Sequence, residues 1–244
     1  MLASQSGRPL VQHVVDQAKK AIRVREVIVA TDDARIVDAL APFGTRCVMT
    51  SPAHQTGTDR VAEVARELSD DVIVNVQGDE PEIDPDVIDR LIERMTNHDD
   101  DIATASTPFA NRADVMNPNM VKVVTSLTGQ ALYFSRSVIP MDRDKSLSDV
   151  GSQSGSAVGA AAWRGSDAFQ LHLGIYAFRR VFLLDFSSWA PTRLEQIEKL
   201  EQLRALEHGK RIYVMPVARA SHGIDTPEQY EAFLQRSRET VLNV

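Results

Sequence analysis

Hydrophobic residues recur with alternating helical and strand periods along the first half of the chain. From Pro9 to Ile22 they return at helical spacing, and Pro9 suits a first helical turn, so this stretch predicts an amphipathic helix. The run EVIVATDD, Glu26 to Asp33, is short and β-rich and passes directly into polar residues, which is typical of a strand. The pattern also predicts helices near 34–40, after a cap near Thr58, and over 85–95, with strands at RCVMT and VIVNVQ. Strands that alternate with helices predict an α/β fold with a mostly parallel sheet.

The pattern loosens in the second half of the chain. Short apolar runs predict strands at DIATAST, MVKVV, ALYFS, HLGIYAF and IYVMPV, and periodic leucines predict one long amphipathic helix from Thr192 to Leu206. The weaker alternation after Ile102 predicts antiparallel additions to the sheet. The segment between Lys145 and Asp167 is rich in Gly, Ser and Ala, and these residues are too small and too flexible to form a core of their own. We therefore predict a surface loop over 145–167, within a single domain that spans 1–244.

Composition narrows the class of protein. With 244 residues, 43% of them hydrophobic, the chain can bury one sizeable core. The net charge of −7 and the lack of a basic stripe argue against a nucleic-acid partner. No apolar run approaches the roughly 18 residues of a membrane span, and MLASQSGRPL lacks the regions of a signal peptide. The single cysteine, Cys47, excludes an internal disulfide and is expected to be a small buried hydrophobe. We expect a cytoplasmic protein without membrane insertion.

One predicted strand ends in carboxylates. In NVQGDEP, the residues Gln77, Gly78, Asp79 and Glu80 directly follow the apolar run VIV. Ligands of open parallel sheets gather beyond the carboxyl ends of the strands, and a glycine there lets the backbone approach a ligand closely. An aspartate in this place can hold a hard cation such as Mg²⁺ together with substrate phosphates. The alternative is a turn whose carboxylates are solvated.

A second carboxylate, Asp225, stands just before a predicted helix. In GIDTPEQ, Thr226 can cap the helix, Pro227 can take its first position, and Gln229 completes a T-x-x-Q capping box. With Thr226 as the cap, the side chain of Asp225 is left free. Asp225 is therefore a candidate for a second metal ligand or for a partner of the helix dipole.

Other polar residues have both a structural and a functional interpretation. Asp32 and Asp33 follow a strand, and helix capping is expected of one of them. His172 and Tyr176 are four positions apart in HLGIYAF and would share one face of a strand, where a histidine is more often a satisfied core residue. The predicted long helix places three polar side chains on the face opposite its leucines, namely Glu198, Glu201 and Gln202. Such a face is usually simply solvated.

Seven blocks of the sequence carry a family resemblance. They are, in order, HQTGTDRVAE, NVQGDEP, NPNMVKVV, ALYFSRSVIPMDRD, HLGIYAF, LEQIEKLEQLRALEHG and GIDTPEQ. Together they closely resemble the 3-deoxy-manno-octulosonate cytidylyltransferases. The resemblance implies a nucleotide-diphosphosugar-transferase-like (Rossmann-like) α/β fold, with a mixed sheet flanked by helices, in a homodimer. It also implies transfer of CMP from CTP to 3-deoxy-D-manno-octulosonate (Kdo), which gives CMP-Kdo and pyrophosphate for lipopolysaccharide synthesis.

The resemblance also implies roles for single residues. Asp79 and Asp225 would be the catalytic carboxylates that bind Mg²⁺. Gln77 would contact the nucleotide or the sugar, Arg60 is a candidate for the CTP side, and Glu80 is left as structural. The implied sugar-binding residues are Arg136, which would meet the sugar carboxylate through its guanidinium fork, and His172, Tyr176, Glu201 and Gln202.

The start of the chain departs from the family. Members open with an apolar strand and a basic loop resembling ARxxSTRLPGKPL, whose basic residues hold the triphosphate, whereas GRPLVQHV here matches the segment after that loop. Such a first strand is usually interior, so without it we expect an open core and unpaired backbone groups on both neighbouring strands. Weaker transition-state stabilisation is expected as well. We expect that Met1 is an internal start and that the native chain extends upstream.

Two alternative functions remain open from the sequence. The chain could be a cytidylyltransferase for another acidic sugar, such as a relative of sialic acid, although HLGIY and LEQLR argue against this. It could also be a non-catalytic, dimerising remnant that binds the sugar but lacks the CTP loop. Measuring activity with CTP over a panel of sugar acids tests the first alternative. Binding of Kdo without turnover of CTP would identify the second.

Overall fold

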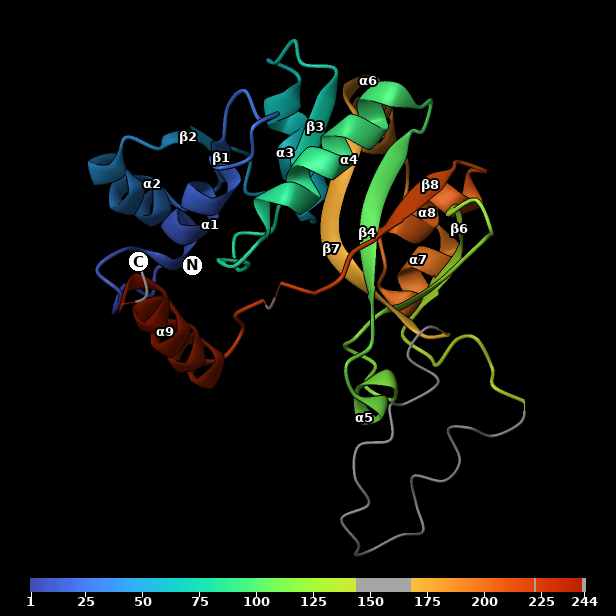
Figure 1. Cartoon of the computed structure of the whole chain (residues 1–244). Coiled ribbons are helices and arrows are strands. Elements are labelled where there is room, and N and C mark those ends of the chain that lie inside the picture. Colours follow the sequence, from blue (N-terminus) through green and yellow to red (C-terminus); the bar gives the residue numbers. More distant parts are fainter. Residues whose placement is uncertain (144–167, 222, 243–244) are drawn as a thin grey trace, which may run out of the picture. The chain divides into compact units, whose positions relative to one another are not determined.

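The computed structural model describes residues 1–143, 168–221 and 223–242 (Figure 1). The chain forms two compact units: unit 1 comprises Met1–Asp99, Ile175–Ser188 and Ser221–Val244, and unit 2 comprises Asp100–Gly174 and Trp189–Ala220. The surface loop predicted over 145–167 lies outside the described residues. The single domain predicted for 1–244 stays a prediction, because the two units are defined by packing alone.

Unit 1 follows the predicted alternation of helices and strands. Asp33 caps α2, since its carboxylate accepts the N–H of Arg35, as expected of one of the two aspartates. Thr56, and not Thr58, caps α3 by accepting the N–H of Asp59 over 3.1 Å. The elements of this unit are α1 (Leu10–Ala18), β1 (Ile28–Thr31), α2 (Ala34–Leu40), η1 (Ala41–Phe43), β2 (Arg46–Met49), α3 (Gly57–Ala65), β3 (Val72–Asn75), α4 (Pro85–Asn97), α6 (Arg180–Phe186) and α9 (Pro227–Leu242).

The strands of unit 1 fall into two separate pairings. β1 runs parallel to β2, with Ile28 opposite Arg46, and the two form a two-stranded sheet. β3 runs antiparallel to the second half of β7 (Gln170–Arg179), with Val72 opposite Arg179. Helix α3 packs against both β1 and β3, and α4 packs against β3 (Figure 1). Within the described part of the chain, no strand joins β1 to β3.

Unit 2 is built on a mixed sheet. Its elements are β4 (Ile102–Pro108), α5 (Arg112–Val115), β5 (Lys122–Thr125), β6 (Ala131–Ser135), the first half of β7, α7 (Arg193–Glu198), α8 (Gln202–Glu207) and β8 (Ile212–Pro216). The strand order is β6-β5-β7-β4-β8, in which β4 and β8 are parallel while β5 is antiparallel to β6 and to β7. The predicted mixed sheet is confirmed. The mostly parallel sheet predicted from the alternation is wrong, because β3, β5 and β6 pair antiparallel.

The long helix predicted from Thr192 to Leu206 is interrupted at Lys199. Helix α7 opens with a capping box of Thr192 and Glu195 and ends at Lys199, whose φ of 54° is left-handed. The turn lets Leu200 be buried while Ile197 is 66% exposed. The single helical face predicted for Glu198, Glu201 and Gln202 is therefore wrong. Periodicity does not reveal the turn, because the leucine spacing continues across it.

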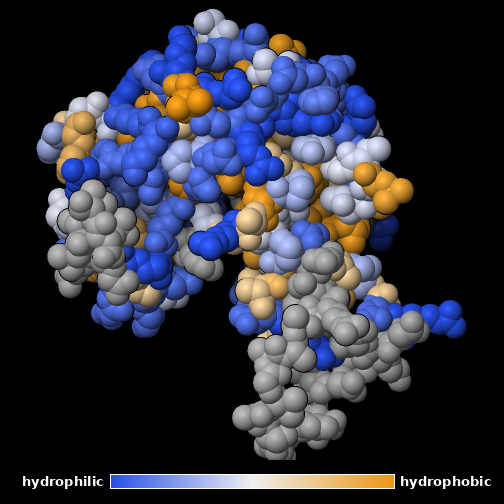
Figure 2. Space-filling model, viewed as in Figure 1, coloured by the Kyte–Doolittle hydropathy of each residue, from blue (hydrophilic) through white to orange (hydrophobic). Residues whose placement is uncertain are grey.

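Each unit has its own buried clusters and a largely hydrophilic surface. Val11, Ile36 and Leu40 form one cluster in unit 1, with Cys47 packed against it, and burial raises the pKa of this thiol. On the face that Figure 2 shows, hydrophobic side chains lie in small groups among hydrophilic ones. A search of the described helices finds none with the length and apolar character needed to cross a membrane.

Candidate functional site

The turn after β3 is joined to the segment that precedes α9. The N–H of Ile224 donates to the carbonyl of Asp79 over 2.8 Å, and the Ile224 side chain is buried beside Leu10 and Tyr230. A Cβ added at Gly223 would lie 3.8 Å from Asp79 Oδ2, so the segment passes close to this carboxylate. The backbone contact at Ile224 thereby brings Asp225 to Asp79.

The cap of α9 fixes the position of Asp225. Gln229 Oε1 accepts the N–H groups of Asp225 and Thr226 over 2.8 and 2.9 Å, and the N–H of Gln229 donates to Thr226 Oγ1 over 3.3 Å. Pro227 is the first residue of the helix. The predicted capping box is confirmed. Because Thr226 is the cap, the carboxylate of Asp225 is available to interact with Asp79.

Asp79 and Asp225 form a crowded pair of carboxyls. Burial is the main cause that raises the pKa of Asp79, and the negative charge of Asp225 raises it further. A divalent cation would remove this repulsion, and carboxylate oxygens are ligands that Mg²⁺ prefers. No group of three His, Cys, Asp or Glu side chains that could hold a metal ion occurs among the described residues. Two protein carboxylates, completed by phosphates and water, are a usual set for Mg²⁺, so the donor set fits this ion.

Glu80 lies next to Asp79 but has a different environment. Its carboxylate accepts the hydroxyl hydrogen of Ser221 over 2.7 Å, and burial raises its pKa. This bond is a second connection between the turn after β3 and the segment before α9. The contact supports the structural role predicted for Glu80.

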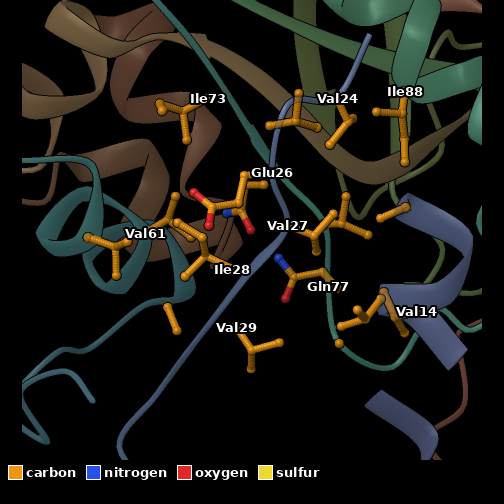
Figure 3. A pocket seen from close by; sticks show the side chains of 18 of the residues that line it. Val14, Val24, Glu26, Val27, Ile28, Val29, Val61, Ile73, Gln77 and Ile88 are labelled. Atoms are coloured by element: carbon orange, nitrogen blue, oxygen red, sulfur yellow. The ribbon is translucent and has the colours of Figure 1, made fainter. Parts of the chain in front are cut away.

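A pocket of about 630 Å³ lies between β1 and β3 (Figure 3), and several polar residues line the end of it at which the two strands finish. Gln77 follows β3, Asp32 follows β1, and Arg60 reaches this end from α3. Arg60 donates from Nη2 to Asp32 Oδ2 over 3.0 Å and from Nη1 to Thr50 Oγ1 over 2.6 Å. Gln77 is exposed, and a Cβ at Gly57 would lie 3.8 Å from its amide nitrogen. The predicted residues Arg60 and Gln77 therefore both lie at the carboxyl ends of these strands.

In unit 2, Arg136 is held by hydrogen bonds on several sides. Its Nε, Nη1 and Nη2 donate to the carbonyls of Glu198, Pro118 and Lys199 over 2.7, 3.1 and 3.2 Å. Its backbone N–H donates to Glu198 Oε2 over 2.9 Å, and its carbonyl accepts from Lys122 Nζ over 2.8 Å. A guanidinium has five N–H donors, so about two stay available for a carboxylate.

Glu198 and Lys122 support Arg136, and the sequence interpretation missed both roles. Glu198 Oε1 accepts the hydroxyl hydrogen of Ser135 over 2.6 Å. Lys122 is fully buried opposite Ser135 in the β5–β6 ladder, and burial lowers its pKa. Its Nζ also donates to the carbonyl of Asn117 over 2.9 Å. The available signal was a lysine inside the apolar run MVKVV, since a lysine is almost never fully buried unless it is paired.

His172 and Tyr176 both lie on β7 but belong to different units. Buried positions alternate with partly exposed ones along the strand, so the two side chains share a face as predicted. His172 Nε2 lies 3.1 Å from Thr104 Oγ1, and its ring meets Phe134 edge-on at 5.0 Å. Burial lowers the pKa of His172 to about 3, so the imidazole is neutral at pH 7. Tyr176 stacks on Phe178 at 5.7 Å.

Glu201 and Gln202 stand at the start of α8. Gln202 is only 6% exposed, and its Nε2 atom has no hydrogen-bond partner among the described residues. An unpaired buried amide is unfavourable, which makes this atom a candidate donor to a ligand. A buried ion pair anchors the helix, since Arg204 donates from Nε and Nη2 to the Glu195 carboxylate over 2.8 and 2.5 Å.

Comparison with known proteins identifies the family. A model of the family described as Cytidylyltransferase matches residues 1–212. The 3-deoxy-manno-octulosonate cytidylyltransferases of Geotalea daltonii and Geobacter sulfurreducens are 47% and 46% identical to this chain. The matches cover 98% and 96% of this chain and 91% of each relative. This chain belongs to the 3-deoxy-manno-octulosonate cytidylyltransferase family.

Solved structures agree with membership of the cytidylyltransferase family. The structure of CMP:2-keto-3-deoxy-manno-octonic acid synthetase complexed with CTP matches with a TM-score of 0.84 at 34% identity, over 98% of this chain and 91% of that one. A nucleotidyl transferase from Methanothermobacter thermautotroptrophicus shares the fold, with a TM-score of 0.56 at 19% identity over 98% and 85% of the two chains. The predicted family, enzyme class and mixed α/β fold are confirmed. The roles of the individual site residues stay predictions.

Proposed function

We propose that this cytidylyltransferase transfers CMP from CTP to Kdo and releases pyrophosphate. The observation that carries the proposal is the Asp79–Asp225 pair at the carboxyl end of β3, in a chain 47% identical to an enzyme named for this reaction. The anomeric hydroxyl oxygen of Kdo forms a bond to the α-phosphorus of CTP. The bond from that phosphorus to the bridging oxygen breaks, pyrophosphate leaves with its electron pair, and the proton of the attacking hydroxyl is released to solvent.

Asp79 and Asp225 are the residues that would hold Mg²⁺. When bound, the ion supplies neutralisation of negative charge on the phosphates. The chain's own contribution is positional: Ile224 N–H fixes the backbone of Asp79, and the cap at Thr226 fixes Asp225. Folding thus brings both carboxylates together before the substrates bind. Groups placed in advance in this way need not rearrange as the transition state forms.

The nucleotide side also uses Arg60 and Gln77 in this proposal. Arg60 keeps its guanidinium oriented through Asp32 and Thr50, and it supplies positive charge beside the strand ends. Gln77 offers an exposed amide for a hydrogen bond to the nucleotide or the sugar.

The sugar-binding roles in this proposal are those that the family resemblance implies. Arg136 would bind the carboxylate of Kdo through its remaining guanidinium donors. Gln202 Nε2, which is buried and without a partner among the described atoms, would donate to a sugar hydroxyl. His172 is neutral and can take part in hydrogen bonding without introducing charge. Glu201 and Tyr176 complete the proposed set.

Pyrophosphate release from the purified chain tests this function. We expect release that requires CTP, Kdo and Mg²⁺ together, and little release when Kdo is replaced by other sugar acids. Equal release with a sialic acid would favour a cytidylyltransferase for another acidic sugar. Absence of release in every combination would contradict the proposal.

A second candidate function is favoured by one observation. Among the described residues, β1 and β3 share no neighbouring strand, while unit 2 keeps the contacts proposed for the sugar. A chain of this structure could therefore bind the sugar without catalysing the transfer of CMP. Calorimetric binding of Kdo by a chain that does not turn over CTP would identify this function.

We further propose a cytoplasmic homodimer that serves lipopolysaccharide synthesis, without a nucleic-acid partner or membrane insertion. The support for the dimer, the compartment and the pathway is the family resemblance, and the net charge of −7 disfavours nucleic acid. Sedimentation of the purified chain tests the dimer, because a monomer at micromolar concentration would contradict it.

A further inference from the structure

The connection between β2 and α3, residues 50–56, lies beside the two residues proposed for the nucleotide. Arg60 donates from Nη1 to Thr50 Oγ1 over 2.6 Å, so the first residue of this connection is bonded to α3. Beyond its last residue, a Cβ at Gly57 would lie 3.8 Å from the amide nitrogen of Gln77. The path of the 50–56 connection therefore bears on the positions of both Arg60 and Gln77.

Glu63 of α3 binds the 50–56 connection at two points. Its Oε2 atom accepts the backbone N–H of Ser51 over 3.0 Å and also contacts Nε2 of His54. The bond from Ser51 and then the bond from His54 lower the pKa of Glu63, so its carboxyl group is ionised at pH 7. An ionised carboxylate only accepts hydrogen bonds, so Nε2 of His54 carries a hydrogen and donates it. One carboxylate oxygen thus holds both the start and the middle of the connection.

Ser51 is held through both of its backbone polar groups by side chains of one helix. Its N–H donates to Glu63, and its carbonyl accepts from Arg60 Nη1 over 3.5 Å. Arg60 and Glu63 are three positions apart, so they lie on the same face of α3. Ser51 Oγ and the Ser51 carbonyl also accept the N–H groups of Ala53 and His54 over 3.2 and 3.5 Å. The connection has no helix or strand of its own, so these bonds determine its path.

We propose that Glu63 is a positioning residue for the nucleotide: by binding Ser51 and His54, it holds the 50–56 connection on α3 and so keeps the Arg60 guanidinium oriented. This inference rests on the proposed function, in which Arg60 supplies positive charge to CTP. When the connection is released, Arg60 loses two of its acceptors, and a guanidinium that is free to rotate binds a phosphate less well. The residues proposed for Kdo in unit 2 take no part in these bonds, so the affinity for Kdo should not change.

The kinetics of Glu63→Ala test the positioning role. We expect the KM for CTP to rise about tenfold, while the KM for Kdo changes by less than about twofold. Glu63→Gln keeps an oxygen that can accept the N–H of Ser51, so its KM for CTP should lie between those of wild type and Glu63→Ala. Glu67→Ala, at an exposed position just after α3, is the control and should match wild type. Equal rises in the two KM values, or an unchanged KM for CTP, would overturn the role.

Two measurements without turnover separate this inference from the proposed reaction. In Glu63→Ala, amide hydrogens of residues 51–56 should exchange about tenfold faster than in wild type, because the N–H of Ser51 loses its acceptor. Calorimetry with CTP alone should show about tenfold weaker binding by the same variant.

The outcomes distinguish the two proposals. Both effects in a chain that releases no pyrophosphate would support the role of Glu63 and contradict the transferase reaction. Unchanged exchange and unchanged CTP affinity in Glu63→Ala, in a chain that does release pyrophosphate, would overturn the role of Glu63 alone. No binding of CTP by the wild-type chain would contradict both.

Discussion

The residues proposed for the sugar in unit 2 and those proposed for the nucleotide and metal in unit 1 are supported in different ways. Arg136 has its backbone N–H, its carbonyl and three guanidinium nitrogens engaged by neighbouring residues of the same unit. Asp79 and Asp225 instead lie on turns, which are joined by the backbone bond at Ile224 and by the bond between Ser221 and Glu80, beside strands that border an apolar pocket. Arg136 is held through its own guanidinium, whereas Asp79 and Asp225 are placed through hydrogen bonds of their backbone and of neighbouring residues.

The difference shows where folding alone can position a site. On the sugar side, the hydrogen bonds around Arg136 are made within the chain, so its geometry does not depend on a ligand. At the carboxyl pair, burial and the negative charge of Asp225 both raise the pKa of Asp79, and the proposed Mg²⁺ would remove this repulsion. Four substitutions sharpen this comparison, and they are ordered by the size of the expected effect.

The largest effect is expected from breaking the buried ion pair that anchors α8. Arg204→Met leaves Glu195 as an uncompensated buried carboxylate and should lower the free energy of unfolding by about 3–5 kcal/mol. Arg193→Met, at an exposed position of α7, should change it by less than about 0.5 kcal/mol. Urea unfolding of both variants is the measurement. A loss below about 1 kcal/mol for Arg204→Met would show that the pair does not anchor the sugar side.

The next effect is on turnover. Asp79→Asn keeps the size of the side chain but removes a negative ligand for Mg²⁺, and we expect pyrophosphate release to fall about a hundredfold or more. Glu80→Gln is the matched control, because Glu80 is adjacent but bonded to Ser221. It should retain most of the activity. Similar losses in the two variants would mean that the turn, and not the carboxylate of Asp79, is what matters.

A smaller effect is expected at Glu198, which positions Arg136. Glu198→Ala removes the acceptor for Ser135 Oγ and for the backbone N–H of Arg136, so the KM for Kdo should rise about tenfold with little change in kcat. Glu198→Gln keeps one acceptor and should be intermediate. Ile197→Ala, at an exposed neighbouring position, serves as the control. A fall in kcat with an unchanged KM would contradict a role through the sugar carboxylate.

The last effect is on the free energy of unfolding at acidic pH. The pKa of His172 is about 3 in the folded chain and about 6.5 when unfolded, so below pH 6.5 the unfolded state binds more protons. The associated stability is present above pH 6.5 and is lost as the pH falls towards 3. His172→Asn should reduce the difference in unfolding free energy between pH 7.5 and pH 5. An unchanged difference, relative to wild type and to the exposed control His98→Asn, would show that the pKa of His172 is not lowered in the folded chain.

The fold was predictable where local chemistry decides the structure. The cap at Thr226 with Gln229, the cap at Asp33 and the carboxylate at the end of a buried strand all follow from residues that are neighbours in sequence. The antiparallel pairing of β3 with β7 did not, because it joins segments that are distant along the chain. The turn at Lys199 was hidden by a leucine spacing that continues through it.

The candidate site was predictable to a similar extent. Asp79 was recognisable from its place after a strand, whereas its proximity to Asp225 depends on the backbone bond at Ile224. The role of Glu198 depends on contacts with Ser135 and Arg136, which periodicity within one helix does not contain. The family resemblance supplied the substrate, which no single residue here specifies.

The most direct test of the proposed reaction is pyrophosphate release by the purified chain with CTP, Kdo and Mg²⁺, measured beside Asp79→Asn. We predict release that depends on all three components and falls about a hundredfold in the variant. Release that is independent of Kdo, or equal in the two proteins, would contradict transfer of CMP to Kdo at the Asp79–Asp225 pair.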